Sequence, residues 1–267
     1  MQKKMSIKFR IASIPYFVWL TVFAFIPMIT TAFLAFTNSE SDFTLDNIFN
    51  VVDYSSIFLR SLGLAAVSTL ICLIFGFPMA LIISKLEYKI QKIMITLVIV
   101  PMWFSFLLKT YSWMTIFEDH GILNNILNNF GIHTQIINTP GAVIFGMVYN
   151  FFPYMVLPIY SSLSKADPNI FEAARDLGAN RFQILKKIIF PLSFPGIISG
   201  LTMVFVPSVS TFIISKMLGG GAQILVGELI EMRFLGGAYN PNSGSALALV
   251  LMIFVGICIG LMNSFGN

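Results

Sequence analysis

Six long apolar segments, separated by short polar ones, constrain this chain more than any other feature. A helix that crosses a bilayer needs about 20 mostly apolar residues. Because lipid offers no hydrogen-bond partners, backbone N–H and C=O groups must be paired inside the protein, and helices do this within one segment. The sequence therefore predicts an all-α, polytopic membrane protein with transmembrane helices at about 14–36, 56–84, 93–117, 140–163, 191–215 and 245–265.

Composition supports a single transmembrane domain spanning 1–267. Hydrophobic residues make up 57% of the chain and charged residues only 10%, whereas soluble domains carry about 25% charged residues. The first apolar run covers about 26 residues, from 11 to 36. Since the apolar core of a signal peptide has roughly 7–15 residues, this run is interpreted as an uncleaved membrane helix.

The distribution of charge predicts the orientation. With the N-terminus placed inside the cell, the inner segments hold 12 of the 16 basic residues, and eight of the 12 acidic residues lie outside. An excess of Lys and Arg on cytoplasmic loops is the usual pattern, so both termini are expected in the cytoplasm. The inner basic residues are Lys3, Lys4, Lys8, Arg10, Lys85, Lys89, Lys92, Lys165, Arg175, Arg181, Lys186 and Lys187.

Several function classes lack the residues they need. The net charge of +4 is spread between apolar blocks and forms no single basic face, so nucleic acid is not an expected partner. The chain has no phosphate-binding Gly-x-x-x-x-Gly-Lys-Ser/Thr and no clustered nucleophile. His120 and His133 have no metal-ligand spacing, and Cys72 and Cys258 are expected to pack as apolar thiols. No metal, cofactor or catalytic site is expected.

The largest predicted inner loop, here called the elbow (residues 165–190), carries the strongest local signal. Asp167 suits a helix N-cap, with Pro168 at the first helical position. Gly178 suits the left-handed residue that ends the helix, and a second short helix is expected from Arg181 to Ile189, ending before Pro191. Composition alone also fits an amphipathic connector lying on the membrane surface.

A resemblance to a known family favours a docking role for the elbow. Glu172-Ala173-Ala174, then Gly178, Ile188 and Pro191, resembles the EAA motif of ABC importer permeases, with Phe190 where the motif prefers Leu. The stretch Pro101-Met102-Trp103, followed by 109–113, is similar to polyamine-type permeases, although Lys109 replaces the usual Arg. The region 219–234 is also similar to the permeases of spermidine/putrescine importers. The resemblance covers nearly the whole chain.

This resemblance implies the type I ABC importer permease fold in a bacterial cytoplasmic membrane. It implies a second permease subunit of the C type, two ATPase subunits that bind ATP and Mg²⁺, and an extracellular polyamine-binding protein. In the family the elbow is the coupling helix that sits in a groove of the ATPase. Carried over to this chain, the ATPase-coupling residues are Glu172, Ala173, Ala174, Asp176 and Gly178.

A polyamine carries several ammonium groups, so its path needs acids, carbonyl groups and aromatic faces. The candidates expected to line this path are Tyr111, Trp113, Glu118, Asp119, Tyr149, Asn150, Tyr154, Glu228 and Glu231. Each has an alternative role: the aromatic residues could belong to an interfacial belt, the acids could be solvated, and Asn150 could bond between helices. A permease for iron, molybdate, sulfate or an opine would share the elbow, and an autonomous channel or membrane enzyme is the remaining alternative.

Overall fold

The computed structural model describes residues 15–38 and 40–266, except the side chains of residues 168, 171, 172, 263, 265 and 266. Among these residues the secondary structure is helical apart from one isolated bridge, so the all-α prediction is confirmed. The chain divides into two compact units, Met1–Ser55 with Ile230–Ile253, and Ser56–Leu229 with Phe254–Asn267. Within the described residues, five helices are long and apolar enough to cross a membrane, or six if one bent pair counts as a span.

The first unit joins an apolar N-terminal helix to the start of the last helix. Its helices include η1 (Thr21–Phe25), α2 (Ile26–Ala35), α3 (Asp46–Phe49), η2 (Asn50–Tyr54) and the first part of α14 (Pro241–Gly266). The Asn242 side chain donates to the backbone oxygens of Thr37 at 2.7 Å and Leu34 at 3.1 Å. The amide joins the last turn of α2, and Thr37 just beyond it, to the start of α14. The last carbonyls of a helix can accept such bonds because they have no partner in the regular helical pattern.

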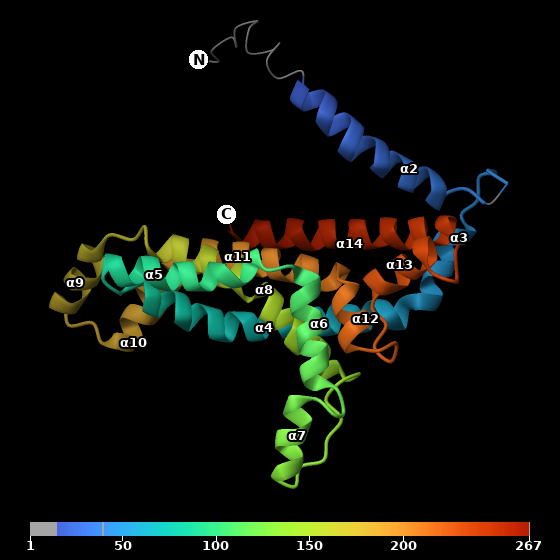
Figure 1. The fold of residues 1–267 in the computed structure, drawn as a ribbon. Helices are drawn as coiled ribbons and strands as arrows, with labels where there is room; N and C mark the ends of the chain where they lie inside the picture. Colours follow the sequence, from blue (N-terminus) through green and yellow to red (C-terminus); the bar gives the residue numbers. More distant parts are fainter. Residues whose placement is uncertain (1–14, 39, 267) are drawn as a thin grey trace, which may run out of the picture. The chain divides into compact units, whose positions relative to one another are not determined.

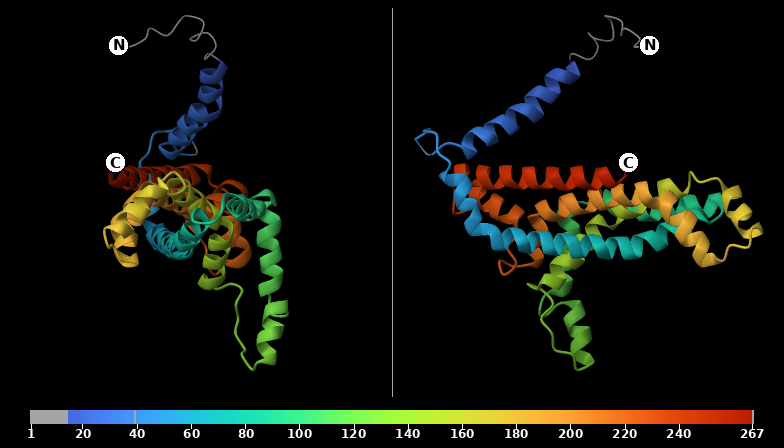
Figure 2. Two further views of the ribbon diagram at one scale, coloured as in Figure 1. Left: turned by 90° about the vertical axis from the view of Figure 1, so that its left-hand side faces the viewer. Right: turned by 180° about the vertical axis from the view of Figure 1, so that it is seen from behind.

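The second unit is built around α8. Its elements are α4 (Ser55–Ser84), α5 (Tyr88–Ile99), η3 (Val100–Trp103), α6 (Phe106–Phe117), α7 (Ile122–Asn129), α8 (Pro140–Leu163), α9 (Pro168–Asp176), α10 (Arg181–Ile184), η4 (Leu185–Ile189), α11 (Phe190–Ser210), α12 (Ile213–Leu218) and the start of α13 (Val226–Leu235). Figures 1 and 2 show α4, α8 and α11 running alongside one another, with the elbow at one end. Met147, Met155 and Ile159 of α8 are fully buried in the core between them.

Glycines allow α8 and α11 to approach closely. A Cβ atom on Gly196 would lie 2.6 Å from the carbonyl oxygen of Pro158, and one on Gly200 would lie 2.8 Å from Sδ of Met155. Small residues at such contacts let two helix backbones approach closely. Close packing matters in a membrane because the hydrophobic effect does not drive helices together there. The two helices that flank the elbow are therefore held in direct contact.

Two wide π-helical turns lie just before prolines. The turn Thr21–Phe25 precedes Pro27, and the turn Leu185–Ile189 precedes Pro191. A proline ring clashes with the carbonyl one turn earlier, and a π turn relieves this clash without ending the helix. As a result the helix from Arg181 continues to Ser210, so the prediction that it ends before Pro191 is wrong.

The third predicted span, 93–117, is also not one straight helix. A bend of 87° separates Tyr88–Trp103 from Phe106–Asn129. Pro101 lies in the short 3-10 turn η3, and Phe104 is extended with ψ 146°. Because an extended residue cannot continue a helix, α6 and α7 leave the α4–α8–α11 bundle at a steep angle (Figures 1 and 2).

The close contact of α8 and α11 gives a stability prediction. Gly196→Ala places a methyl group against backbone atoms of Pro158 and Ile159, and we expect a cost of about 1–3 kcal/mol. Gly260→Ala is the matched control, because a Cβ there meets nothing within 4 Å and the substitution brings the same gain in helix propensity. Thermal unfolding in detergent should show a lower midpoint for Gly196→Ala only; equal midpoints for the two variants would contradict the packing.

Candidate functional site: the elbow and the opposite face

The elbow begins with a capped helix, as predicted. The carboxylate of Asp167 accepts a hydrogen bond from the backbone N–H of Asn169 at 3.0 Å, and Pro168 is the first residue of α9. Proline fits here because the first N–H groups of a helix have no partner within it. The N-terminus of α9 is thus fixed by its own sequence.

The end of α9 is a Schellman turn. Gly178 has φ +80°. Its N–H donates to the carbonyl of Arg175 at 2.8 Å, and the N–H of Ala179 donates to the carbonyl of Ala174 at 3.0 Å. These two bonds satisfy carbonyls that the end of the helix leaves unpaired, and they need a left-handed residue between them. The predicted helix-ending role of Gly178 is confirmed.

The second arm of the elbow begins with a capping box. Asn180 accepts from the backbone N–H of Gln183 at 2.8 Å, and the Gln183 side chain accepts from the N–H of Asn180 at 2.9 Å. Local hydrogen bonds therefore cap both ends of α9 and the start of α10, with Gly178 and Ala179 between the two arms. A turn with this many local bonds holds the angle between its helices.

The predicted coupling residues have different surroundings. Ala173, Asp176 and Gly178 are exposed, whereas Ala174 is half-buried and packs with Ala179 against the core. The smallness of Ala174 therefore serves contact within the chain, and only Ala173 presents its small surface outward. The side chain of Glu172 lies outside the described residues.

Two exposed apolar side chains complete the outer surface of the elbow. Leu177 is 88% exposed and Phe182 is 70% exposed, on either side of the Schellman turn. Sequence reasoning missed both. The usable signal is that each is a large apolar residue close to a residue whose conformation a turn or cap fixes: Leu177 directly precedes Gly178, and Phe182 lies two residues after Asn180.

At the other end of the second unit, aromatic rings form a packed cluster. The ring of Trp113 on α6 lies 4.5 Å from that of Phe145, 5.2 Å from that of Tyr149 and 5.4 Å from that of Phe117, measured between centroids. Two of the predicted path residues, Trp113 and Tyr149, are thus together. Their partners Phe117 and Phe145 were not predicted, since an apolar ring carries no polar signal in the sequence.

The remaining path candidates lie in separate surroundings. Tyr111 and Glu118 line one hollow of about 490 Å³, and Asp119 lines another of about 270 Å³. Asn150 is 3% exposed and donates Nδ2 to the carbonyl of Gly146 at 3.0 Å, within its own helix. The other candidates are Tyr154, which is exposed on α8, Glu228, which is buried on α13, and Glu231, which is half-buried on α13.

No group of three or more His, Cys, Asp or Glu residues is placed to hold a metal ion within the part of the chain that the structure describes. The groups available to a ligand or partner are the exposed residues of the elbow and the aromatic and acidic side chains around α6 and α8.

A helical membrane subunit with a rigid elbow between two packed spans defines a class of transport components. The chain belongs to the family described as binding-protein-dependent transport system inner membrane component, whose model matches residues 6–263. Its curated relatives are permeases, in agreement with the prediction of a permease subunit and not an enzyme.

Several of these relatives are named spermidine/putrescine transport system permease protein PotB. The one from Escherichia coli (strain K12) is 38% identical over 252 residues, covering 90% of this chain and 91% of that protein. The one from Haemophilus influenzae is 37% identical over 254 residues, covering 91% of this chain and 88% of that protein.

Solved structures confirm the predicted fold class. A bacterial ABC transporter involved in the import of the acidic polysaccharide alginate matches with a TM-score of 0.76 at 19% identity, covering 97% of this chain and 94% of that chain. The MetNI methionine ABC transporter in an inward facing conformation matches with a TM-score of 0.58 at 18% identity, covering 78% of this chain and 92% of that chain.

The left-handed conformation of Gly178 gives a second prediction. Gly178→Ala should destabilise the turn by about 1–2 kcal/mol, because a Cβ is strained at this φ. Hydrogen exchange of the backbone amides in α9 should then be about tenfold faster. Gly237→Ala is the control, since its Cβ meets nothing within 4 Å and its φ is not in that region; unchanged exchange in Gly178→Ala would contradict the assigned role.

Proposed function

We propose that the elbow is the joint through which this permease subunit docks to a separate ATP-hydrolysing subunit. The observation that carries the proposal is an elbow of two capped helices in which Ala173 on α9, Leu177 at the end of α9 and Phe182 on α10 are exposed to solvent. Burying one large apolar side chain contributes about 1.5–3 kcal/mol. A rigid knob of this kind suits a groove on a partner, and the EAA-like residues Glu172 to Ala174 lie on the same short helix, α9.

Movement of the partner would reach the membrane through the helices that flank the elbow. ATP and Mg²⁺ would be bound by the partner, whose closure would push or pull α9. Glu172 is the proposed polar anchor of the joint and Asp176 a second charged contact, while Gly178 sets the angle. Two discrete packings of the membrane helices, inward-open and outward-open, would then be biased by the nucleotide state.

We further propose that the assembly contains a second permease subunit of the C type, two ATPase subunits and an extracellular binding protein. Both termini and the elbow would face the cytoplasm. The support is the family membership, the alginate transporter that was solved with a periplasmic protein, and the concentration of Lys and Arg in the segments assigned to the inside.

The proposed substrate is a polyamine such as spermidine or putrescine. The support is the 38% identity to a spermidine/putrescine permease along nearly the whole length of both chains. The aromatic residues Trp113 and Tyr149 and the acids Glu118 and Asp119 supply the groups that bind ammonium ions. A permease for iron, molybdate, sulfate or an opine is the alternative, because the elbow would be the same in each.

The docking proposal predicts that the exposed apolar residues of the elbow are needed for coupling. Leu177→Ala with Phe182→Ala should lower transport and binding-protein-stimulated ATP hydrolysis together, by about tenfold or more, because two buried anchors are lost. Glu172→Ala should act in the same direction. Tyr88→Ala is the matched control, as Tyr88 is 81% exposed but lies on α5. Normal transport by the double variant, with the subunit present in the membrane, would contradict the proposal.

The substrate proposal is tested by uptake. Cells that lack their own polyamine importer and express the complete assembly should accumulate radiolabelled spermidine in an ATP-dependent manner. Excess unlabelled putrescine should compete because it shares the spaced ammonium groups, whereas sulfate should not because its charge is opposite. Competition by sulfate, or ATP-driven uptake of sulfate instead of spermidine, would favour the alternative.

A further inference from the structure

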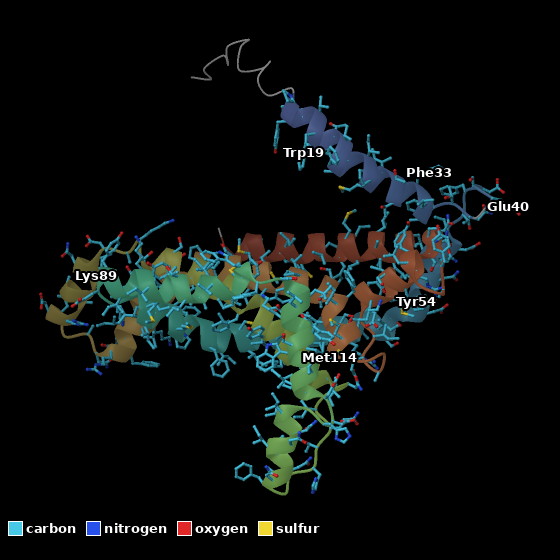
Figure 3. All side chains as sticks on the ribbon, viewed as in Figure 1. Trp19, Phe33, Glu40, Tyr54, Lys89 and Met114 are labelled. Atoms are coloured by element: carbon cyan, nitrogen blue, oxygen red, sulfur yellow. The ribbon has the colours of Figure 1, made fainter. Side chains whose placement is uncertain are left out.

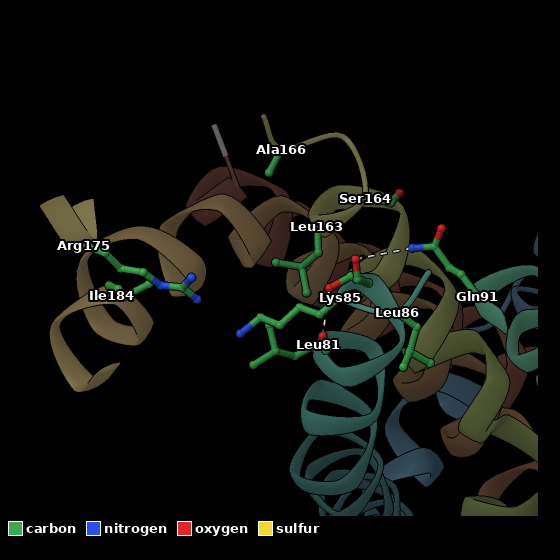
Figure 4. Close-up of a pocket in the computed structure, with 10 residues that line it drawn as sticks. Leu81, Lys85, Leu86, Gln91, Leu163, Ser164, Ala166, Arg175 and Ile184 are labelled. Carbon is green, nitrogen blue, oxygen red and sulfur yellow. Dashed lines mark hydrogen bonds between the residues drawn. The ribbon is translucent and has the colours of Figure 1, made fainter. Parts of the chain in front are cut away.

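A hollow of about 460 Å³ lies where α4 and α8 end, next to the elbow (Figure 4). A neighbouring hollow of about 540 Å³ shares Leu81, Lys85, Arg175 and Ile184 with it. We treat the two as one elbow pocket. Its wall includes Gln91 of α5, whose side chain donates to the carbonyls of Ile83 and Ser84 at 3.4 Å each and so ties α5 to the end of α4.

Positive charge from three elements converges on the elbow pocket. Lys85 comes from the chain just after α4, Arg175 from α9 and Arg181 from α10. In Figure 4 the ammonium group of Lys85 reaches toward the guanidinium group of Arg175. Among the described residues that line the pocket, none is acidic. Like charges directed at one space repel, so an anion bound between them is favoured.

Apart from Ser84, Gln91 and Ser164, the rest of the pocket wall is apolar. Leu81 and Leu163 lie near the ends of two membrane-length helices, α4 and α8, and Ile184 faces them from α10. A pocket at the ends of spanning helices lies at the boundary between hydrocarbon and water. A free phosphate ion would use only the cations and would leave the apolar wall in water. A ligand with an anionic head and hydrocarbon chains satisfies both parts.

We propose that the elbow pocket binds an anionic phospholipid. Its phosphate lies among Lys85, Arg175 and Arg181, and its acyl chains pack along Leu81, Leu163 and Ile184. Basic pockets between membrane helices are suited to acidic lipid head groups. The bound lipid would connect the end of α4 with both arms of the elbow. This site is separate from the exposed surface of Leu177 and Phe182, and its test needs neither transport nor docking.

The test is lipid retention by the purified protein, with whichever subunits remain attached. The detergent-solubilised sample is incubated with equal amounts of phosphatidylglycerol and phosphatidylcholine of matched acyl chains, and the retained lipid is measured by native mass spectrometry. The wild type should retain phosphatidylglycerol preferentially. Lys85→Gln with Arg181→Gln should lower that retention about thirtyfold, since each basic residue near an anionic head group contributes about 1 kcal/mol.

Lys89→Gln with Lys92→Gln is the matched control. These two lysines lie on α5 at the same end of the second unit (Lys89 is labelled in Figure 3), carry the same charge and do not line the pocket. This variant should retain phosphatidylglycerol like the wild type. Equal loss of phosphatidylglycerol in the two double variants would indicate a mere effect of net charge and would overturn the proposal. Equal retention of phosphatidylglycerol and phosphatidylcholine by the wild type would overturn it as well.

Two further arms separate the lipid from other anions. Addition of inorganic phosphate should not displace the phosphatidylglycerol, because phosphate lacks the hydrocarbon that fills the apolar wall. Full displacement would overturn the lipid assignment in favour of a phosphate site. In the intact assembly, a carboxyl–amine crosslinker that joins Lys85 to an acidic residue of another subunit, with no lipid retained, would overturn it in favour of a protein partner.

Discussion

The close contact between α8 and α11 is the constraint on which the rest of the second unit depends. The elbow is the connection between these two helices, so it can act as a joint only if they do not slide independently. Gly196 and Gly200 place the α11 backbone directly on Pro158 and Met155 of α8. In lipid, such van der Waals contact replaces the hydrophobic force that holds helices together in water.

The π turn and the prolines at the start of α11 determine how this helix is connected to the elbow. The π turn Leu185–Ile189 lets the helix pass Pro191, so one helix runs from Arg181 in the elbow to Ser210. At about 1.5 Å per residue, its 30 residues extend about 45 Å. Thr211 is extended with ψ 138° and ends it. The second arm of the elbow and the span that follows it are therefore one continuous helix up to Thr211, with Pro195 and Pro207 in its interior.

The sequence was sufficient wherever local chemistry decides the structure. Asp167, Pro168 and Gly178 define α9 through caps that need no distant residue, and apolar length located the spans. The sequence was insufficient where a proline can either break a helix or be accommodated within it. Pro101 accompanies a break, whereas Pro191 is accommodated by a π turn, and the difference depends on tertiary packing. For the same reason, the inward position of Ala174 and the ring partners of Trp113 could not be predicted from spacing.

The aromatic cluster restricts how a cation can use Trp113. A cation–π contact requires access to the face of a ring, and the rings of Phe145 and Tyr149 of α8 meet Trp113 in an edge-to-face arrangement at 4.5 and 5.2 Å. Trp113 belongs to α6, which is joined to α5 through the extended residue Phe104 and an 87° bend. At such a break in the helix, rotation about a few backbone dihedral angles is enough to reorient the helix that follows. Separation of α6 from α8 at that break would move Trp113 away from Phe145 and Tyr149 and would leave the α8–α11 contact intact.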